Sequence, residues 1–349
     1  MRIAAVGRAL PPHYYDQDVL VAALRRRWAG QYFNADRLDR MHKNLLVGGR
    51  HLALPIEEYD AITSWGKAND AWIRVSQEVG GAAVEDALSR AALAPADVDA
   101  IFFVSVTGIA TPSIDARLIN RIGFSTRIKR VPIFGLGCVA GAAGLARAAD
   151  YVRGFPDQVA LLLSVELCSL TLQAEDLSIP NLIASGLFGD GAAAVAVVGE
   201  RRTEPGPRIV DTRSIFYPDS ERLLGWDISE RGFQIVLSAD LPQVVRDSLR
   251  QDCDGFLAEH GLARADIASW ICHPGGPKVL EAVQETLELP DGALDLTWDS
   301  LRTVGNLSSS SVLHILAEIL ESHRPPPGSY GVLMAMGPGF CSEIVLLQW

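Results

Sequence analysis

The sequence is poor in cysteine and in positive charge. Only five of the 349 residues are cysteines, an odd number with no CxxC pair, which excludes a structural zinc pattern and a disulfide framework. We therefore expect reduced thiols. Lys and Arg total 31 against 42 Asp and Glu, for a formal net charge of −11. Because phosphate contacts require a positive face, this balance argues against a general affinity for nucleic acid or for anionic membranes.

Long apolar runs are also missing. No segment reaches the roughly 18 uninterrupted apolar residues of a membrane span. The opening sequence MRIAAVGRALPP lacks the apolar stretch and cleavage site of a signal peptide, so we expect a cytoplasmic protein. Hydrophobic residues make up 48% and charged residues 21%, which is typical of a folded protein. Since single cores rarely grow beyond about 250–300 residues, the length predicts two subdomains or one large layered domain.

An internal repeat organises the chain. The segment 93–104 (LAPADVDAIFFV) resembles the segment 262–273 (LARADIASWICH) at an offset of 169 residues, from position 93 to position 262. Each copy follows a helical stretch, about 72–91 and 242–260, and enters an apolar run typical of a buried strand. Three further pairs occur in the same order: Val131–Phe134 with Leu294–Trp298, Val159–Val165 with Tyr330–Met336, and Ala192–Val198 with Glu343–Gln348.

A repeat near half the chain length is too long for a solenoid unit and predicts two similar α/β halves. We expect the halves to be residues 1–205 and 206–349, joined by the linker Arg201–Pro207. Continuous apolar strands alternating with helices indicate sheets that are covered on both faces. The sequence therefore predicts a five-layered αβαβα fold with a pseudo-twofold axis.

Cys138 is the first candidate for chemistry. It lies in a glycine-rich segment, Gly135–Gly144, after a predicted strand and at the start of a predicted helix. Helix N-terminal amides favour a thiolate and would lower the pKa of the cysteine toward neutrality. Free cysteines are also common as small buried hydrophobes, so position alone leaves both interpretations open.

His273 and Asn306 are the other two candidates. His273 ends a predicted strand and precedes the turn Pro274–Pro277, and strand ends are where open α/β sheets bind ligands. The alternative is a histidine that only hydrogen-bonds its turn. Asn306 falls at a helix start, where a helix cap is the ordinary role. At the repeat offset, however, Cys138 corresponds to position 307, so Cys138 and Asn306 are expected at equivalent helix starts near the pseudo-axis.

Two other motif matches are weaker. Gly135-x-Gly137-x-x-Ala140 fits a dinucleotide fingerprint, but Asp157 precedes its strand, whereas a ribose-binding acid belongs at the far end. The chain order Cys, His, Asn matches papain-like hydrolases, which carry a CGSCW-type motif that this chain lacks.

The residues resemble the type III polyketide synthases, the chalcone synthase-like branch of the thiolase fold, over nearly the whole chain. Fatty-acid condensing enzymes share the cysteine, histidine and asparagine but lack two of the matching motifs, the string around His273 and the terminal Gly-Pro-Gly loop. The matching segments are Gly137-Cys138, Leu187–Ala192 (LFGDGA), Trp270–Pro277 (WICHPGGP), Gly305–Ser309 (GNLSS) and Met336–Phe340 (MGPGF).

The resemblance implies roles for these residues. Cys138 would carry the acyl group and be activated by His273 through a thiolate–imidazolium pair. Asn306 and His273 would donate hydrogen bonds to the thioester oxygen of malonyl-CoA as it loses carbon dioxide. No metal or bound cofactor would be required, since coenzyme A thioesters are the substrates. Phe188 resembles the gatekeeping aromatic between the coenzyme A tunnel and the cavity.

Further residues follow from the same resemblance. Arg37 and Arg40, three apart on the predicted helix Asn34–Asn44 and near Lys43, resemble the cations at the tunnel entrance, and a solvated helix face is the alternative. A homodimer is also implied. The residues expected to line or shape the cavity are Cys168, Thr171, Val106, Thr111 and Ala184.

The resemblance is closest to actinobacterial enzymes that extend fatty acyl-CoA starters into alkylpyrones and alkylresorcinols. Synthases that make tetrahydroxynaphthalene from malonyl-CoA alone tend to carry a cysteine where this chain has Val106. We therefore expect malonyl-CoA and a fatty acyl-CoA starter as partners. The first alternative is a malonyl-CoA-only synthase of the tetrahydroxynaphthalene or dihydroxyphenylacetyl-CoA type. The others are a cysteine-dependent thioester or amide hydrolase and a non-catalytic thiolase-fold subunit.

Overall fold

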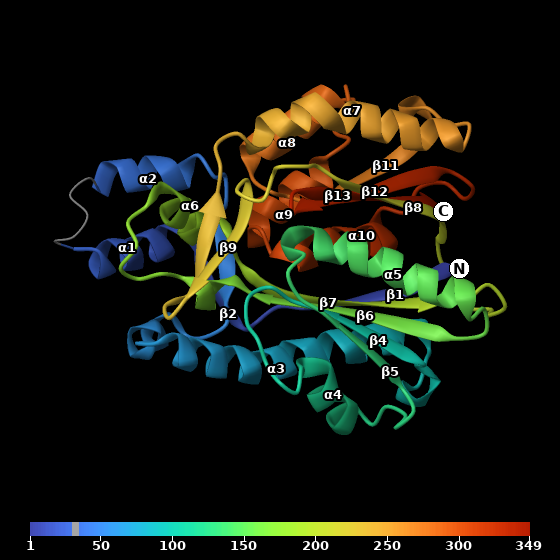
Figure 1. The fold of residues 1–349 in the computed structure, drawn as a ribbon, viewed down its shortest axis with the longest axis horizontal. Coiled ribbons are helices and arrows are strands. Elements are labelled where there is room, and N and C mark those ends of the chain that lie inside the picture. Colours follow the sequence, from blue (N-terminus) through green and yellow to red (C-terminus); the bar gives the residue numbers. More distant parts are fainter. Residues whose placement is uncertain (30–34) are drawn as a thin grey trace.

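The computed structural model describes residues 1–29 and 35–349, and Figure 1 shows their arrangement. Within these residues the largest sheet has nine strands. One half-sheet has the order β1 (Arg2–Ala9), β7 (Asp190–Val198), β6 (Val159–Leu167), β4 (Ala100–Val104) and β5 (Lys129–Ile133). The other half-sheet has the order β8 (Arg208–Phe216), β13 (Cys341–Gln348), β12 (Tyr330–Gly337) and β11 (Ile267–Cys272).

The two half-sheets have the same strand order. Reading outward from the centre, β1, β7, β6 and β4 correspond to β8, β13, β12 and β11, with the same sequence of antiparallel and parallel pairings. They meet where β1 pairs with β8, at Arg2 opposite Arg208. The duplication predicted from the 169-residue offset is therefore present in the fold.

The fifth strand of the second half is missing. The segment 294–298, matched in sequence to the strand segment 131–134, instead opens helix α9 (Asp295–Val304). Its buried residues Leu294, Thr297 and Leu301 are spaced three and four apart, which is the period of a helix. That expectation was wrong because the apolar residues follow the helical period.

Helices form the other layers (Figure 1). Helices α3 (Trp65–Ala91) and α4 (Ile114–Ile122) cover the outer face of the first half-sheet. Helices α5 (Ala140–Gly154) and α10 (Ser311–Ser322) lie between the two half-sheets, and α7 (Leu241–Glu259) and α8 (Pro277–Thr286) cover the second. This is the expected five-layered fold.

Shorter elements gather at one end of the sheets. They include the two-stranded ribbons β2–β3 and β9–β10, three helices and the 3₁₀ turns that carry the site. Their bounds are β2 (His13–Asp16), β3 (Gly49–Leu52), β9 (Leu224–Ser229), β10 (Gly232–Leu237), α1 (Gln17–Arg27), α2 (Ala35–Lys43), α6 (Ile179–Leu187), η1 (Ile56–Ala61), η3 (Gly137–Val139), η4 (Cys168–Thr171) and η6 (Ser308–Ser310). Two further 3₁₀ turns, η2 (Pro95–Asp97) and η5 (Arg264–Asp266), lead into the opposite ends of β4 and β11.

The central layer unites the halves through apolar packing. Every residue of β4, β6 and β7 is buried, as expected for strands covered on both faces. One core cluster contains side chains from α5, α10 and both half-sheets, among them Leu145, Leu316, Val195 and Leu333. Burial of this shared core supplies the main attraction between the halves.

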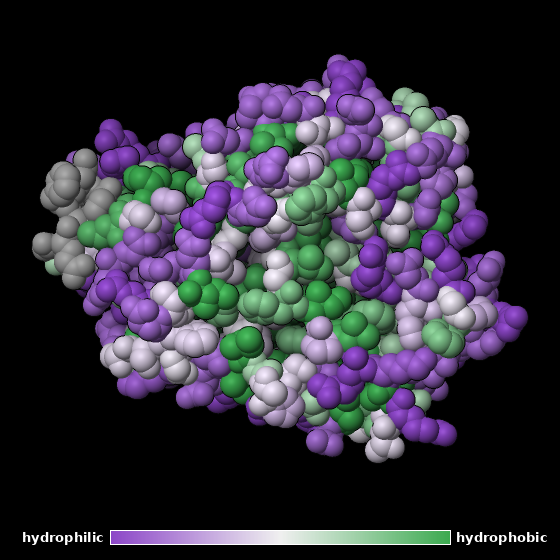
Figure 2. All heavy atoms as spheres, viewed as in Figure 1, coloured by the Kyte–Doolittle hydropathy of each residue, from purple (hydrophilic) through white to green (hydrophobic). Residues whose placement is uncertain are grey.

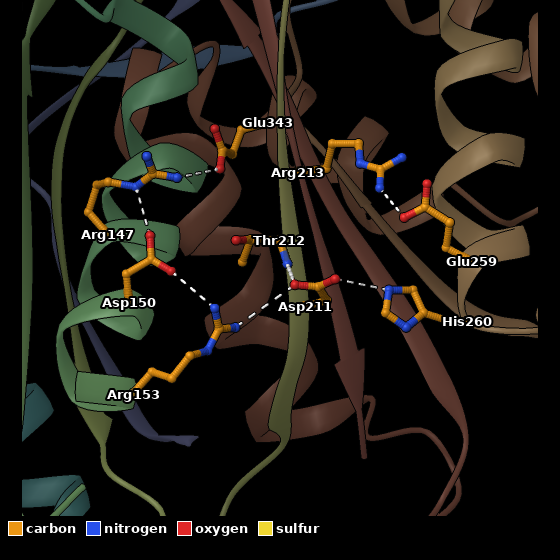
Figure 3. A network of polar contacts seen from close by, with 9 residues as sticks. All are labelled: Arg147, Asp150, Arg153, Asp211, Thr212, Arg213, Glu259, His260 and Glu343. Carbon is orange, nitrogen blue, oxygen red and sulfur yellow. Dashed lines mark hydrogen bonds and ion pairs between the residues drawn. The ribbon is translucent and has the colours of Figure 1, made fainter. Parts of the chain in front are cut away.

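A polar network also crosses between the halves (Figure 3). From α5, the guanidinium of Arg147 lies 3.3 Å from Glu343 of β13, and that of Arg153 lies 3.9 Å from Asp211 of β8. Asp211 in turn lies 3.1 Å from His260 at the end of α7. Arg153 and Asp211 are both partly exposed, so this ion pair contributes little to stability, whereas the partner of Arg147, Glu343, is buried.

Of the helices that the structure describes, none is both long and apolar enough to cross a membrane.

Candidate active site

Cys138 lies in the middle layer, at the start of α5. It belongs to the 3₁₀ turn η3, which leads directly into the helix. Its side chain is buried, and its Sγ lies 3.6 Å from the Oγ of Ser308 in η6, the equivalent turn of the other half. The predicted approach of the two helix starts at the pseudo-axis is therefore present.

His273 follows β11 and is also buried. Its backbone N–H donates to the carbonyl of Met334, which holds the residue at the end of the strand. Neither ring nitrogen has a hydrogen-bond partner among the described residues. The alternative of a histidine whose ring only hydrogen-bonds its turn does not hold, because both nitrogens remain available to a ligand.

Asn306 is held from both sides. Its backbone N–H donates to the Leu187 carbonyl and its own carbonyl accepts from Gly189, so it forms a bridge beside Phe188. Its side-chain Oδ1 accepts from the Ser308 N–H at 2.8 Å, so this contact does not use the NH₂ donors of the amide. The preceding Gly305 has φ +74°, and a Cβ there would lie 2.7 Å from the Leu187 carbonyl oxygen.

The three residues line one small cavity of about 40 Å³. Its other walls are mostly apolar and come from the second half of the chain. Phe188 is also part of this lining. The structure therefore brings together a thiol, an imidazole and a carboxamide, which lie 135 and 33 residues apart in sequence, at positions 138, 273 and 306.

Burial opposes charge on either the thiol or the imidazole alone. Desolvation raises the pKa of Cys138 to about 12, although the hydrogen bond with Ser308 acts in the opposite direction. Desolvation also lowers the pKa of His273 to about 3. The expectation that the helix start would lower the pKa of Cys138 was wrong, because loss of water outweighs the helix amides. Opposite charges formed together, by proton transfer from thiol to imidazole, would offset this cost.

Glu166 is a feature that the sequence analysis missed. This buried carboxylate of β6 accepts hydrogen bonds from Val106 N–H at 3.1 Å, from the Thr107 hydroxyl at 3.0 Å and from the Ser309 hydroxyl. A weaker contact from the Ser308 hydroxyl, at 3.4 Å, links it to the turn beside Cys138. Burial raises the pKa of Glu166 to about 7. No motif marked this residue, because its partners come from three separate segments.

A larger cavity, of about 590 Å³, lies on the other side of Phe188. Cys168, Thr171 and Ala184 line it, as the resemblance implied, and so do Arg50 and Tyr59. A third cavity, of about 470 Å³, shares the wall formed by Thr171. Among the described residues, Phe188, the predicted gatekeeper, is the one that lines both the small and the 590 Å³ cavities.

Four predicted site residues lie elsewhere. Val106 is buried against Glu166, and Thr111 is exposed in a single copy of the chain; neither lines these three cavities. Arg37 and Arg40 are exposed on α2 and do not line them either, whereas Arg26 and Arg27 of α1 line the 590 Å³ cavity. Asn34, the predicted start of the helix, lies outside the described residues.

Metal binding by the described residues would need a group of suitable side chains. Across the described residues there is no group of three or more His, Cys, Asp and Glu side chains that could hold a metal ion.

Comparison with known proteins identifies the family. The family model "Chalcone and stilbene synthases, N-terminal domain" matches residues 1–201, and the corresponding C-terminal model matches residues 208–349. The chain belongs to the chalcone and stilbene synthase family. It is thus a type III polyketide synthase, an enzyme of the acyltransferase type with a thiolase-like fold.

Individual relatives support the same family assignment. The chain is 53% identical to a 1,3,6,8-tetrahydroxynaphthalene synthase of Streptomyces peucetius subsp. caesius, over 99% of this chain and 93% of that protein. It is 37% identical to a putative chalcone synthase of Bacillus subtilis (strain 168), over 99% and 98%. The crystal structure of the tetrahydroxynaphthalene synthase of Streptomyces coelicolor A3(2) matches with a TM-score of 0.95 and 31% identity, over 100% of this chain and 99% of that one.

These relatives confirm some expectations and correct another. Homologous type III polyketide synthases use coenzyme A thioesters as substrates and need no additional cofactor. The expectation of a fatty acyl-CoA starter is not supported, because the relatives favour the alternative, a synthase that uses malonyl-CoA alone. Val106 was the residue used against that alternative. With a tetrahydroxynaphthalene synthase at 53% identity, its presence does not outweigh the similarity of the whole chain.

Proposed function

We propose that this enzyme builds its product from malonyl-CoA alone and releases a polyketide of the tetrahydroxynaphthalene type. The observation that carries the proposal is the 53% identity to a tetrahydroxynaphthalene synthase over 99% of the chain. The lining of the small cavity supports the reaction class, because it combines a nucleophile, a base and a carboxamide donor.

In the proposed reaction Cys138 carries the growing chain. His273 takes the thiol proton, and the resulting thiolate attacks the thioester carbonyl of the first malonyl-CoA, so that coenzyme A leaves as a thiol. Neither ring nitrogen of His273 has a partner among the residues that the structure describes, which is compatible with this transfer. The pair of charges forms together, since burial disfavours either charge by itself.

Extension requires an enolate. A second malonyl-CoA loses carbon dioxide, and the electron pair of the broken bond moves onto the thioester oxygen. The NH₂ group of Asn306 and the ring of His273 donate hydrogen bonds to that oxygen, stabilising charge that develops in the transition state. The enolate carbon then attacks the acyl carbonyl, which expels the Cys138 thiolate and leaves the lengthened chain on coenzyme A. The thiolate attacks this new thioester, coenzyme A leaves, and the chain is again carried by Cys138.

The remaining assignments belong to the same proposal. Phe188 would separate the catalytic cavity from the 590 Å³ cavity, in which Cys168, Thr171 and Ala184 would shape the growing chain. Val106 would act through its hydrogen bond to Glu166 rather than by lining that cavity.

The surface assignments are proposals too. Arg37 and Arg40 would receive the phosphates of coenzyme A on exposed α2, as the resemblance implies. The chain would divide near residue 205 into one half that carries the nucleophile and one that carries the histidine and the asparagine.

We also propose a cytoplasmic homodimer. Figure 2 shows apolar side chains gathered in the middle of one face, between β9 and α5. Ile109 and Phe134, which follow strands β4 and β5, are each about half exposed in a single copy. Thr111 is exposed as well, and a partner copy would cover a loop of this kind.

Incubation with isotope-labelled malonyl-CoA alone, followed by mass analysis of small molecules and of the intact protein, tests the main proposal. We expect an aromatic product whose carbons all carry label, and an acyl adduct on the protein. The variant Cys138→Ala should lose both, whereas Cys253→Ala should keep both, because Cys253 is a buried cysteine of α7 that lines none of the three cavities. A product that forms only after a fatty acyl-CoA is added would contradict the proposal, as would thioester hydrolysis without carbon dioxide release.

A further inference from the structure

Arg50 is a buried cation in the wall of the 590 Å³ cavity. It lies on β3, and only 4% of its surface is exposed. Burial lowers its pKa to about 10, so the guanidinium still carries its charge at neutral pH. A buried charge is costly unless it is paired, so the surroundings of Arg50 need explanation.

The hydrogen-bonding capacity of Arg50 is largely unused. A guanidinium has five N–H donors, yet within the described chain only Nη1 has a partner, the Phe188 carbonyl oxygen at 2.8 Å. Nε is buried without a partner, and no carboxylate of the described residues lies within ion-pair distance. The nearby Asp190 interacts with Arg50 through space, but its oxygens accept from Ala53 N–H at 2.6 Å and from Ser169 N–H at 2.8 Å.

Arg50 is linked to the acyl site through Phe188. Arg50 holds the carbonyl of Phe188, whose side chain separates its cavity from that of Cys138. The Cys168 thiol lies in the same wall as Arg50, and electrostatic interactions link Cys168 with both Arg50 and Cys138. A chain that grows from Cys138 past Phe188 therefore enters a cavity whose wall holds a guanidinium with unused N–H donors, which suits a carboxylate.

We propose that Arg50 binds the terminal carboxylate of the malonyl group carried on Cys138 and thereby selects a carboxylated starter. The inference rests on the proposed function and names the residue that recognises the starter. During loading the Cys138 thiolate attacks the thioester carbonyl, the bond from that carbon to the coenzyme A sulfur breaks, and coenzyme A takes up the proton that Cys138 released. The carboxylate stays on the acyl group and replaces water at the guanidinium.

A matched pair of starters tests the assignment. Succinyl-CoA and butyryl-CoA have acyl groups of similar size and identical coenzyme A phosphates. They differ at the end of the acyl group, which is a carboxylate in succinyl-CoA and a methyl group in butyryl-CoA. The rate of acyl-adduct formation on Cys138, followed by mass spectrometry of the intact protein, gives a ratio of succinyl to butyryl loading. We expect this ratio to exceed one in the wild type, because a charge-assisted hydrogen bond favours the carboxylate.

Two variants separate charge from hydrogen bonding. Arg50→Gln keeps a donor for the Phe188 carbonyl but removes the charge, and we expect the ratio to fall about tenfold or more. Arg50→Lys keeps the charge and should retain most of the ratio. Arg27→Gln, which removes a second cation of the same cavity that is paired with Asp60 at 3.1 Å, is the matched control and should leave the ratio unchanged.

Equal loss of succinyl and butyryl loading in Arg50→Gln would overturn the inference, because it would assign Arg50 to the coenzyme A phosphates or to the placement of Phe188. A wild-type ratio of one or less would overturn it without any variant. Failure of the proposed function would give a different result. The wild-type enzyme would still load these starters but would release no product from malonyl-CoA alone.

Discussion

The contact between helix α5 and turn η6 makes a sharp prediction about how the two halves meet. Gly141 lies in the first turn of α5, three residues after Cys138. A Cβ at this position would lie 2.1 Å from the backbone carbonyl oxygen of Ser309 and 3.0 Å from a methyl group of Val312. An ordinary contact needs at least 3.4 Å, and the Ser309 oxygen cannot rotate away. In Gly141→Ala the helix and the turn must therefore separate by more than an ångström.

Two effects of this change oppose each other. Alanine favours a helix over glycine by about 1 kcal/mol. Overpacking a rigid contact costs about 1–3 kcal/mol, and here both sides are backbone, so the upper part of the range applies. We expect a net loss of about 1–2 kcal/mol in the free energy of unfolding. Because the same contact sets the distance between Cys138 and Ser308, acyl loading should also slow.

Gly154→Ala is the matched control. Gly154 ends the same helix, and nothing lies within 4 Å of an added Cβ, so this variant should be as stable as the wild type or slightly more stable. Urea unfolding of the three proteins, with the rate of acyl-adduct formation measured on each, makes the comparison. If Gly141→Ala unfolded at the same urea concentration as Gly154→Ala, the close approach of the two halves at this point would be refuted.

Two further predictions concern ionisation and assembly. Burial raises the pKa of Glu166 from 4.5 to about 7, so between these two pH values the folded protein keeps a proton that the unfolded chain has lost. The free energy of unfolding of the wild type, measured relative to that of Glu166→Gln, should therefore fall as the pH rises. The fall should reach about 3 kcal/mol and level off above pH 7. If urea titrations gave the same difference in unfolding free energy between the wild type and Glu166→Gln at every pH, this prediction would be contradicted. The proposed homodimer should show about twice the chain mass of 37.6 kDa by light scattering, and Phe134→Ser should weaken it because this side chain is about half exposed in one copy. A monomeric wild type would exclude the dimer.

Much of the fold could be predicted from the chain itself. The repeat was recognisable because each half must bury equivalent strands and turns, which preserves similar apolar runs at a constant offset. The approach of Cys138 to the turn beside Asn306 followed from that offset, and the structure has it at 3.6 Å between Cys138 Sγ and Ser308 Oγ. The segment 294–298 was less predictable, since a short apolar run fits both a strand and a helix until its packing partners are known.

The electrostatic character of the site could not be predicted in the same way. A helix start suggested a lowered pKa for Cys138, whereas the folded environment raises it to about 12 through desolvation. Glu166 and Arg50 carried no motif, although both are buried charged groups beside the site. Thr111, expected in the cavity, lies at the surface of a single copy.

The amino-acid sequence by itself determined the duplicated α/β architecture, because periodic apolar residues and turn motifs are local properties of the chain. The repeat offset brought Cys138 near Asn306, and the family resemblance added His273. Only the tertiary structure decided which ionisable groups lose their water, which of them find partners and which face a cavity. Those outcomes depend on distances between segments that are far apart in the sequence, and desolvation free energies change steeply with such distances.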